Sequence, residues 1–223
     1  MALGRCMCCR YSDVFEGGTH EMEWSAAVRE YFTQVAIERG AQSPIGEFIA
    51  LLASGQAAPG LYSEVVERHG LLREHWFRND RLDLVLGYVR AALEAGPLDR
   101  ERQRDVTHLK EWLEIAEGEF ATHRPVEVAT LLQGQLEVIL DDREISEAED
   151  LYQVELQRAF DLGYDQYLAF TRTVLERVRS DLSMVNADAL AGPARARLRR
   201  QRAALEPLYC LAVAQPRTLG ALY

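Results

Sequence analysis

Lysine is almost missing from this chain, and so are long apolar runs and alternating strand patterns. Lys110 is the only lysine among 25 basic residues, and a bias this strong toward arginine is typical of GC-rich, bacterial genomes. No run of 18 apolar residues occurs, so no segment is predicted to be a transmembrane helix. Glycine (15 residues) and proline (7 residues) are not enriched, which excludes fibrous and low-complexity chains.

Cysteine is also scarce. Cys6, Cys8 and Cys9 lie close together near the amino terminus, and Cys210 lies far away. The surrounding stretch, MALGRCMCCRYSDVFEGG, has no apolar core of the secretory type, so a cytoplasmic location is expected. The C-x-C-C spacing, even with His20 downstream, is not a common zinc pattern. We therefore expect plain or redox-sensitive thiols and no zinc at these cysteines.

Charge is distributed unevenly over the 223 residues. The formal net charge is −10, but residues 1–182 carry 18 Arg and one Lys against 33 acidic residues, while residues 183–223 carry six Arg against two. The acidic body repels phosphates, so binding of duplex nucleic acid by the body is not expected. The Arg-rich extension is either a solvated helix docked through Leu198 and Leu205, or a segment that lies on the acidic body, on an acidic partner or on a second copy.

Apolar residues recur with helical spacing almost throughout, and no strand-like alternation occurs. The pattern predicts an all-α chain with a single helical domain of about eight or nine helices. The domain is expected over residues 21–182, after an irregular cysteine-containing segment (1–20) and before the Arg-rich extension (183–223).

Local signals predict several helix boundaries. A first helix is expected from His20 to Arg39, and Ser43 followed by Pro44 marks the start of the next. LLREHWF is predicted to be a separate turn or short helix, followed by a clear helix from Asn79 or Asp80. Asp99 is expected to cap a helix whose apolar seam extends to Ala116, and Asp165 to cap a long helix before residue 184.

Two turns 47 positions apart resemble each other. Leu98 and Ile145 each follow an inward-facing helix and a short charged turn, and each precedes a new amphipathic helix that ends at a glycine. The pattern indicates a duplicated helix–turn–helix unit.

The second of these turns resembles a signature of the TerB-like (tellurite-resistance B) family of all-helical domains. Asp142-Arg143-Glu144-Ile145-Ser146, followed by Glu149, matches its acidic turn, aliphatic residue, helix cap and following glutamate. LGYDQY is similar to the turn that leads into the family's next helix, and the resemblance covers about residues 82–178. Arg143 stands where the family usually has glycine, and Ala95 where the first turn would have aspartate. The resemblance implies a metal-binding acidic surface and a place in bacterial stress or defence.

The acidic stretch DDREISEAED, residues 141–150, has two interpretations. Ser146 and Glu149 match an S-x-x-E capping box, and further carboxylates in the first turn suit the helix dipole. Alternatively, Asp141, Asp142, Glu144 and Glu149 present oxygen ligands to a divalent cation such as Ca²⁺ or Mg²⁺. The spacing is not that of an EF-hand loop, and no His or Cys adjoins the stretch.

No sequence motif of nucleotide binding, metalloprotease or hydrolase chemistry occurs, and no catalytic residue is predicted. The leading hypothesis is a non-enzymatic protein-interaction or sensing module whose partner is another protein. One alternative is a helical enzyme or small-molecule-binding protein with a pocket between the amino-terminal helices and residues 82–178. The other is a structural protein that self-assembles through its Arg-rich tail.

Overall fold

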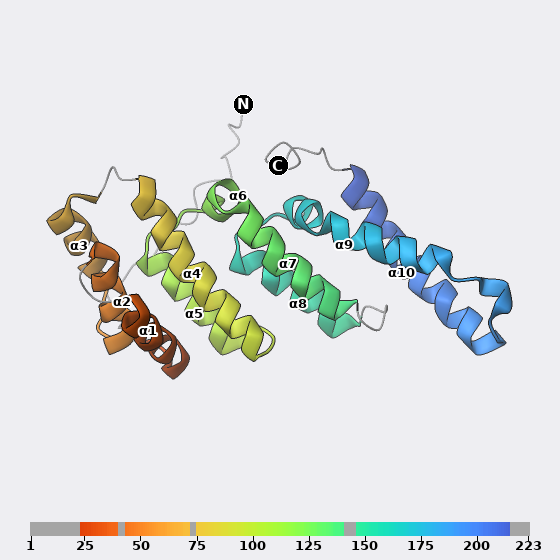
Figure 1. Ribbon diagram of the computed structural model, residues 1–223, viewed down its shortest axis with the longest axis horizontal. Helices are drawn as coiled ribbons and strands as arrows, with labels where there is room; N and C mark the ends of the chain where they lie inside the picture. The colour runs from red at the N-terminus through yellow and green to blue at the C-terminus, as the bar shows by residue number, and fades with distance from the viewer. Residues whose placement is uncertain (1–22, 40–42, 72–74, 141–145, 215–223) are drawn as a thin grey trace, which may run out of the picture.

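The computed structural model describes residues 23–39, 43–71, 75–140 and 146–214. Ten α-helices and one short 3₁₀ helix occupy most of these ranges (Figure 1). The elements are α1 (Ala26–Arg39), α2 (Pro44–Ser54), α3 (Leu61–His69), α4 (His75–Ala95), α5 (Arg100–Trp112), α6 (Glu119–His123), α7 (Pro125–Ile139), α8 (Glu147–Ala159), α9 (Tyr164–Met184), η2 (Ala187–Ala189) and α10 (Gly192–Ala214).

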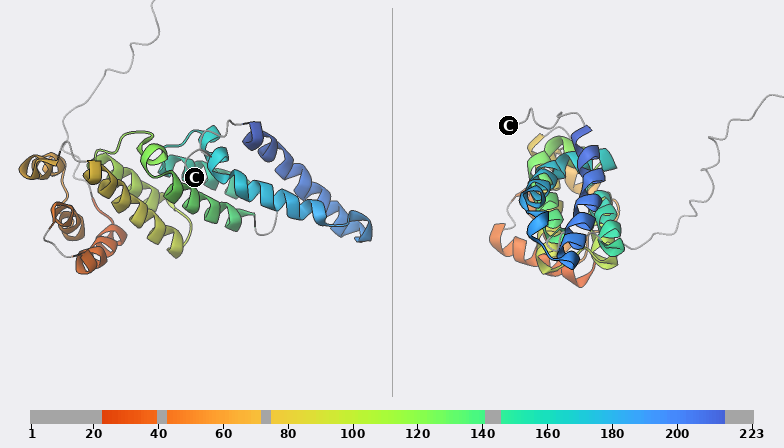
Figure 2. Two further views of the ribbon diagram at one scale, coloured as in Figure 1. Left: turned by 45° about the horizontal axis from the view of Figure 1, so that its top comes forward. Right: turned by 90° about the vertical axis from the view of Figure 1, so that its right-hand side faces the viewer.

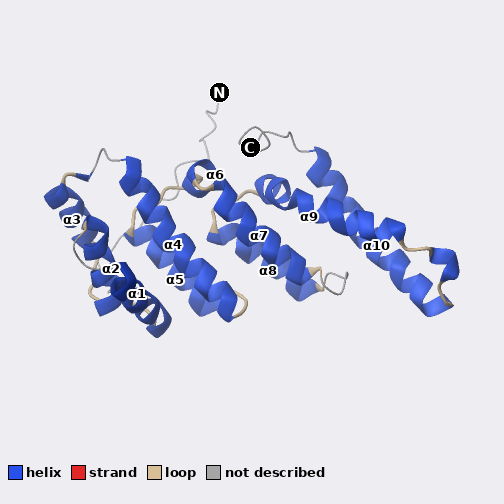
Figure 3. Ribbon diagram, in the orientation of Figure 1, coloured by secondary structure: helices blue, strands red, loops and turns tan. Residues whose placement is uncertain are grey.

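The helices are arrayed along the longest axis of the molecule (Figures 1 and 2). α1, α2 and α3 form one end, the pairs α4–α5 and α7–α8 follow, and α9 with α10 form the other end. α4 contacts α7, and α5 contacts α8, so the two middle pairs stack in the same order. No strand is found in the described ranges (Figure 3), which confirms the predicted all-α class.

The pairs α4–α5 and α7–α8 are two copies of one unit. α5 and α8 begin 47 residues apart and end 47 residues apart. Their N-cap residues, Asp99 and Ser146, keep the same spacing, and each side chain accepts a hydrogen bond from the third helical N–H. The predicted duplication is therefore confirmed, and the same positions are buried in both copies: Val85 and Leu132, Val89 and Leu136, Leu109 and Leu156, Leu113 and Phe160.

The turns that follow α5 and α8 also repeat the same backbone shape. Glu114 and Asp161, again 47 residues apart, are the only non-glycine residues with positive φ in the described ranges, at 50° and 54°. The next residues, Ile115 and Leu162, each donate a 2.9 Å backbone hydrogen bond to a carbonyl five positions earlier. The left-handed conformation costs about 1–2 kcal/mol for a residue with a Cβ. Neighbouring contacts must therefore offset this cost at each of the two turns.

A half-buried or buried cation stabilises each of these turns. Arg81 Nη1 donates to the Leu113 and Glu114 carbonyls at 2.6 and 3.0 Å. The only lysine, Lys110, is buried and donates to the Arg158 carbonyl at 3.0 Å and to Asp161 Oδ1 at 2.7 Å. A cation at the carboxyl end of a helix is favoured by the helix dipole and satisfies carbonyls that have no partner within the helix.

An aromatic cluster joins the first three helices to the α4–α5 pair. The Trp24 and Trp112 rings meet edge to face with centroids 6.1 Å apart, and the Phe48 centroid lies 5.7 Å from that of Trp112. Trp24 Nε1 donates to the Ala57 carbonyl and Trp112 Nε1 to the Ala58 carbonyl. These packed rings lie where one alternative hypothesis placed a pocket.

The Arg-rich segment, as far as it is described, docks on its own chain. α10 packs along α9, and Leu198 and Leu205 are buried between them as predicted. Arg202 donates to the carbonyls of Leu182, in the last turn of α9, and of Val185, its C-cap residue. Arg179 pairs with Glu206 across the two helices. None of the helices in the described ranges is both long and apolar enough to cross a membrane.

Two predicted helix starts were wrong. α1 begins at Ala26, and the preceding described residues are not helical, because Ser25 Oγ accepts the Val28 N–H as a cap. α9 begins at Tyr164 with Gly163 as its N-cap, where Gln166 Oε1 accepts the Gly163 N–H. Asp165 therefore lies inside the first turn and does not cap the helix.

Two further predictions about helix length were also wrong. α4 already begins at His75, so the stretch predicted as a separate short element belongs to it in part. The helix capped by Asp99 ends at Trp112, because Glu114 leaves the helical conformation, and α6 follows as a separate element. Ala116, predicted on the apolar seam, is consequently exposed.

Candidate functional site

The acidic stretch predicted as a cation site lies partly outside the described residues. Asp141, Asp142 and Glu144 fall there, and only Glu149 of the predicted ligands is described. Glu149 Oε2 accepts hydrogen bonds of 2.7 Å from both the backbone N–H and the hydroxyl of Ser146, and the Glu149 N–H donates back to that hydroxyl. The predicted capping box is present. The cation site itself remains a prediction.

The cysteine cluster, Cys6, Cys8 and Cys9, also lies outside the described residues. Cys210 is exposed on α10, with its Sγ 3.8 Å from Glu206 Oε1. Within the described ranges, no group of three His, Cys, Asp or Glu side chains is arranged to hold a metal ion.

A buried carboxylate joins α1, α4 and α5, and the sequence analysis assigned it no role. Asp105 is fully buried, and its Oδ2 accepts from Ser25 Oγ at 2.7 Å and from Tyr88 Oη at 2.6 Å. Its Oδ1 has no hydrogen-bond partner among the described residues. Burial, followed by the hydrogen bond to Asp105, raises the pKa of Tyr88. The arrangement holds α1 on the repeat unit, since Ser25 also caps α1.

A basic hollow lies between α5 and α8 on the surface of the molecule. It has a volume of about 300 Å³, and its apolar lining residues are Val106 and Ala159, both of which are buried. Arg100 and Arg104 line it from α5 and Arg158 lines it from α8. Its remaining lining residues are Gln103, Thr107 and Glu155.

The arginines of this hollow differ in how far their charges are neutralised. Arg100 and Arg104 are exposed and form no hydrogen bond or ion pair with any other described residue. Arg158, whose side chain is 71% exposed, pairs with Glu155 within the same helix at 3.1 Å. An exposed ion pair of this kind contributes little to stability, so Arg158 can readily leave Glu155 for another carboxylate. Three arginines therefore line one hollow in a chain of net charge −10.

Apolar side chains continue the same surface along α8. Leu151 is 63% exposed and Val154 is 40% exposed, and with Arg158 they follow the i, i+3, i+7 spacing of one helix face. The combination offers bidentate donors for carboxylates beside a small apolar strip. Chemically, it suits an acidic segment that also carries an apolar residue.

The sequence offered no signal for this hollow, because Arg158 lies more than 50 positions after Arg100 and Arg104 and belongs to a different helix. Arg100 and Arg104 resemble ordinary solvated charges on a helix when only the sequence is considered. No family model, no curated protein and no solved structure matches this chain.

Proposed function

We propose that the chain is a non-enzymatic protein-interaction module that binds an acidic segment of another protein in the hollow between α5 and α8. The observation that carries the proposal is that Arg100, Arg104 and Arg158 line one hollow whose lining also includes apolar residues. Guanidinium groups match carboxylates with two parallel hydrogen bonds, so acidic peptides are the natural ligands of such a surface. The strip formed by Leu151 and Val154 supplies the neighbouring apolar contact.

The resemblance to TerB-like domains supports the rest of the proposal. It favours a role in bacterial stress or defence, with a divalent cation bound by Asp141, Asp142, Glu144 and Glu149 as an additional ligand. Such a cation would lie at the amino-terminal end of α8, whereas Arg158 lies near its carboxyl-terminal end. Cation binding and peptide binding are therefore tested separately.

Fluorescence anisotropy with a labelled peptide of alternating glutamate and leucine tests the binding site. Arg100→Glu combined with Arg104→Glu should weaken binding at least about tenfold, because attraction is replaced by repulsion inside the hollow. The matched control is Arg199→Glu with Arg200→Glu on α10, where both arginines are exposed. The control changes net charge by the same amount and should alter the affinity less than about twofold, since distant exposed charges are screened at physiological salt.

Equal losses in the two double variants would show that only net charge attracts the peptide. A peptide that binds the α5 double variant as well as the parent would contradict the proposed site directly.

A further inference from the structure

One glycine position is surrounded differently in the two copies of the unit. Gly87 on α4 and Gly134 on α7 are 47 residues apart. A Cβ at Gly87 would lie 2.2 Å from the hydroxyl of Tyr31, whereas a Cβ at Gly134 would meet nothing within 4 Å. Tyr31 belongs to α1, so a helix occupies the glycine face of the first copy. No described element covers the same face of the second copy.

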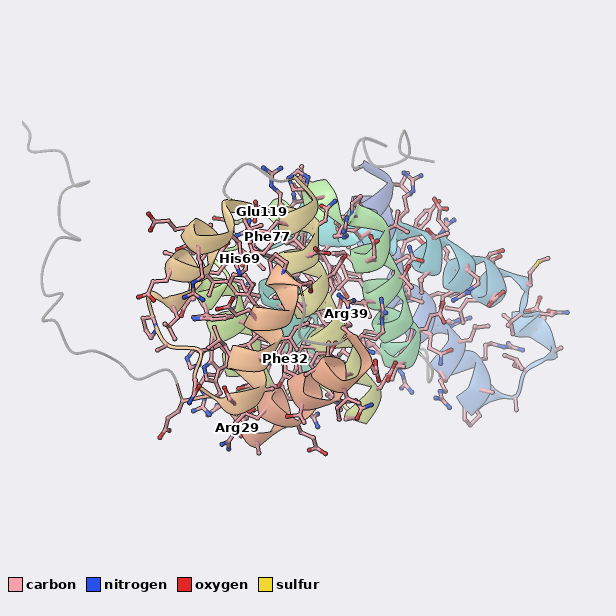
Figure 4. The ribbon with its side chains drawn as sticks, turned by 60° about the vertical axis from the view of Figure 1, so that its left-hand side comes forward. Arg29, Phe32, Arg39, His69, Phe77 and Glu119 are labelled. Atoms are coloured by element: carbon pink, nitrogen blue, oxygen red, sulfur yellow. The ribbon has the colours of Figure 1, made fainter. Side chains whose placement is uncertain are left out.

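The charges beside the two glycines also correspond. Asp80 lies seven residues before Gly87, and Glu127 lies seven residues before Gly134. Arg39, at the carboxyl end of α1 (Figure 4), is close enough to Asp80 to oppose the rise in the pKa of Asp80 that burial causes. α1 therefore places an aromatic hydroxyl against the glycine, and an arginine eight residues later acts to lower the pKa of the acidic side chain. The second copy offers the same two features without the helix.

The uncovered face of α7 has the composition of a helix contact surface. Val126, Thr130, Gly134 and Val138 follow one another at every fourth position, and all four are exposed, Val138 by 69%. The Thr130 hydroxyl already donates to the Val126 carbonyl at 2.8 Å. The stripe carries no charge, and glycine in an exposed helix interior weakens that helix unless something packs on it.

We infer that this α7 face binds an α-helix of a second protein in the way that α4 binds α1. The bound helix presents an aromatic side chain to Gly134 and an arginine, two turns further on, to Glu127. The α7 face recognises this helix in two ways: the two backbones approach closely at Gly134, and Glu127 beside it attracts the arginine. The surface lies on α7, apart from the basic hollow, and does not depend on the function proposed for that hollow.

The test uses a synthetic peptide of residues 24–39, cross-linked between positions 33 and 37 so that it stays helical; both positions are exposed in α1. Its binding to the full chain is measured by fluorescence anisotropy. Gly134→Gln should weaken binding at least tenfold, because the longer side chain fills the place of the aromatic ring. Gly192→Gln, also a glycine with nothing within 4 Å, is the matched control and should leave binding unchanged. Glu127→Gln should weaken binding about threefold, and less at high salt.

A peptide in which Tyr31 is replaced by alanine should bind the parent chain at least tenfold more weakly. Absence of any binding at millimolar peptide would overturn the inference. Binding that is equally strong in the parent chain and in Gly134→Gln would overturn it too, because the peptide would then contact α4 or another surface.

Discussion

Replacing glycine with alanine at two equivalent positions should change stability in opposite directions. Gly134→Ala should raise the free energy of unfolding by about 0.5–1 kcal/mol, because alanine favours the helix over glycine and the new Cβ meets nothing within 4 Å. Gly87→Ala gains the same helix contribution but places its Cβ 2.2 Å from the Tyr31 hydroxyl and 3.4 Å from the ring carbon that bears it. The two variants differ in what packs against the new methyl group, which is Tyr31 at position 87 and nothing at position 134.

Tyr31 has little room to move away from a new methyl group. Its ring meets Phe32 and Tyr88 edge to face, with centroids 5.0 and 5.7 Å apart, and burial raises the pKa of its hydroxyl. Overpacking of this kind costs about 1–3 kcal/mol. Because the helix contribution cancels, the difference in unfolding free energy between the two variants equals that cost.

Urea denaturation followed by circular dichroism at 222 nm measures both free energies. For a chain of this size, each kcal/mol corresponds to a shift of about 2–4 °C in the melting temperature. Tyr31→Phe removes the closest atom, so Gly87→Ala should regain most of its loss in that background. If Gly87→Ala stabilises the protein as much as Gly134→Ala, Tyr31 does not pack on α4, and the contrast between the two copies is wrong.

Three other outcomes are expected. Asp105→Ala should lower the unfolding free energy by about 2–4 kcal/mol, since it leaves two buried hydroxyls without their acceptor; a loss below 1 kcal/mol in urea denaturation would show that water replaces the carboxylate. Burial raises the pKa values of Tyr88 and Tyr167, so their stabilising contribution is present below the unfolded value of about 10 and is lost as the pH rises above it. Absorbance at 295 nm should therefore show the phenolates of Tyr88 and Tyr167 appearing only together with unfolding. Ionisation of all tyrosines at a pH below the unfolding transition would contradict this prediction. Millimolar Ca²⁺ or Mg²⁺ should raise the melting temperature of the parent and of Ser146→Ala, and less so that of Asp142→Asn; no shift in the parent would end the cation hypothesis.

Local sequence signals were sufficient for much of the helical framework. Ser43, Asp99 and Ser146 cap helices as predicted, because an N-cap bond joins residues only three positions apart and depends little on the rest of the fold. The duplication was also visible in the sequence, since each copy must bury the same helix faces and close the same turn. The predicted burial of Leu198 and Leu205 follows from the same periodicity.

The sequence alone determined the helical class, the caps Ser43, Asp99 and Ser146, and the 47-residue repetition, because these depend on contacts within a few residues. Only the tertiary structure decided which of two equivalent faces is covered, since Gly87 and Gly134 look alike until α1 is placed on one of them. The same holds for Glu114 and Asp161, whose left-handed conformation is stabilised by Arg81 and Lys110 from other parts of the chain. The basic hollow likewise exists only when α5 packs on α8, because no local pattern can show that distant arginines will share one surface.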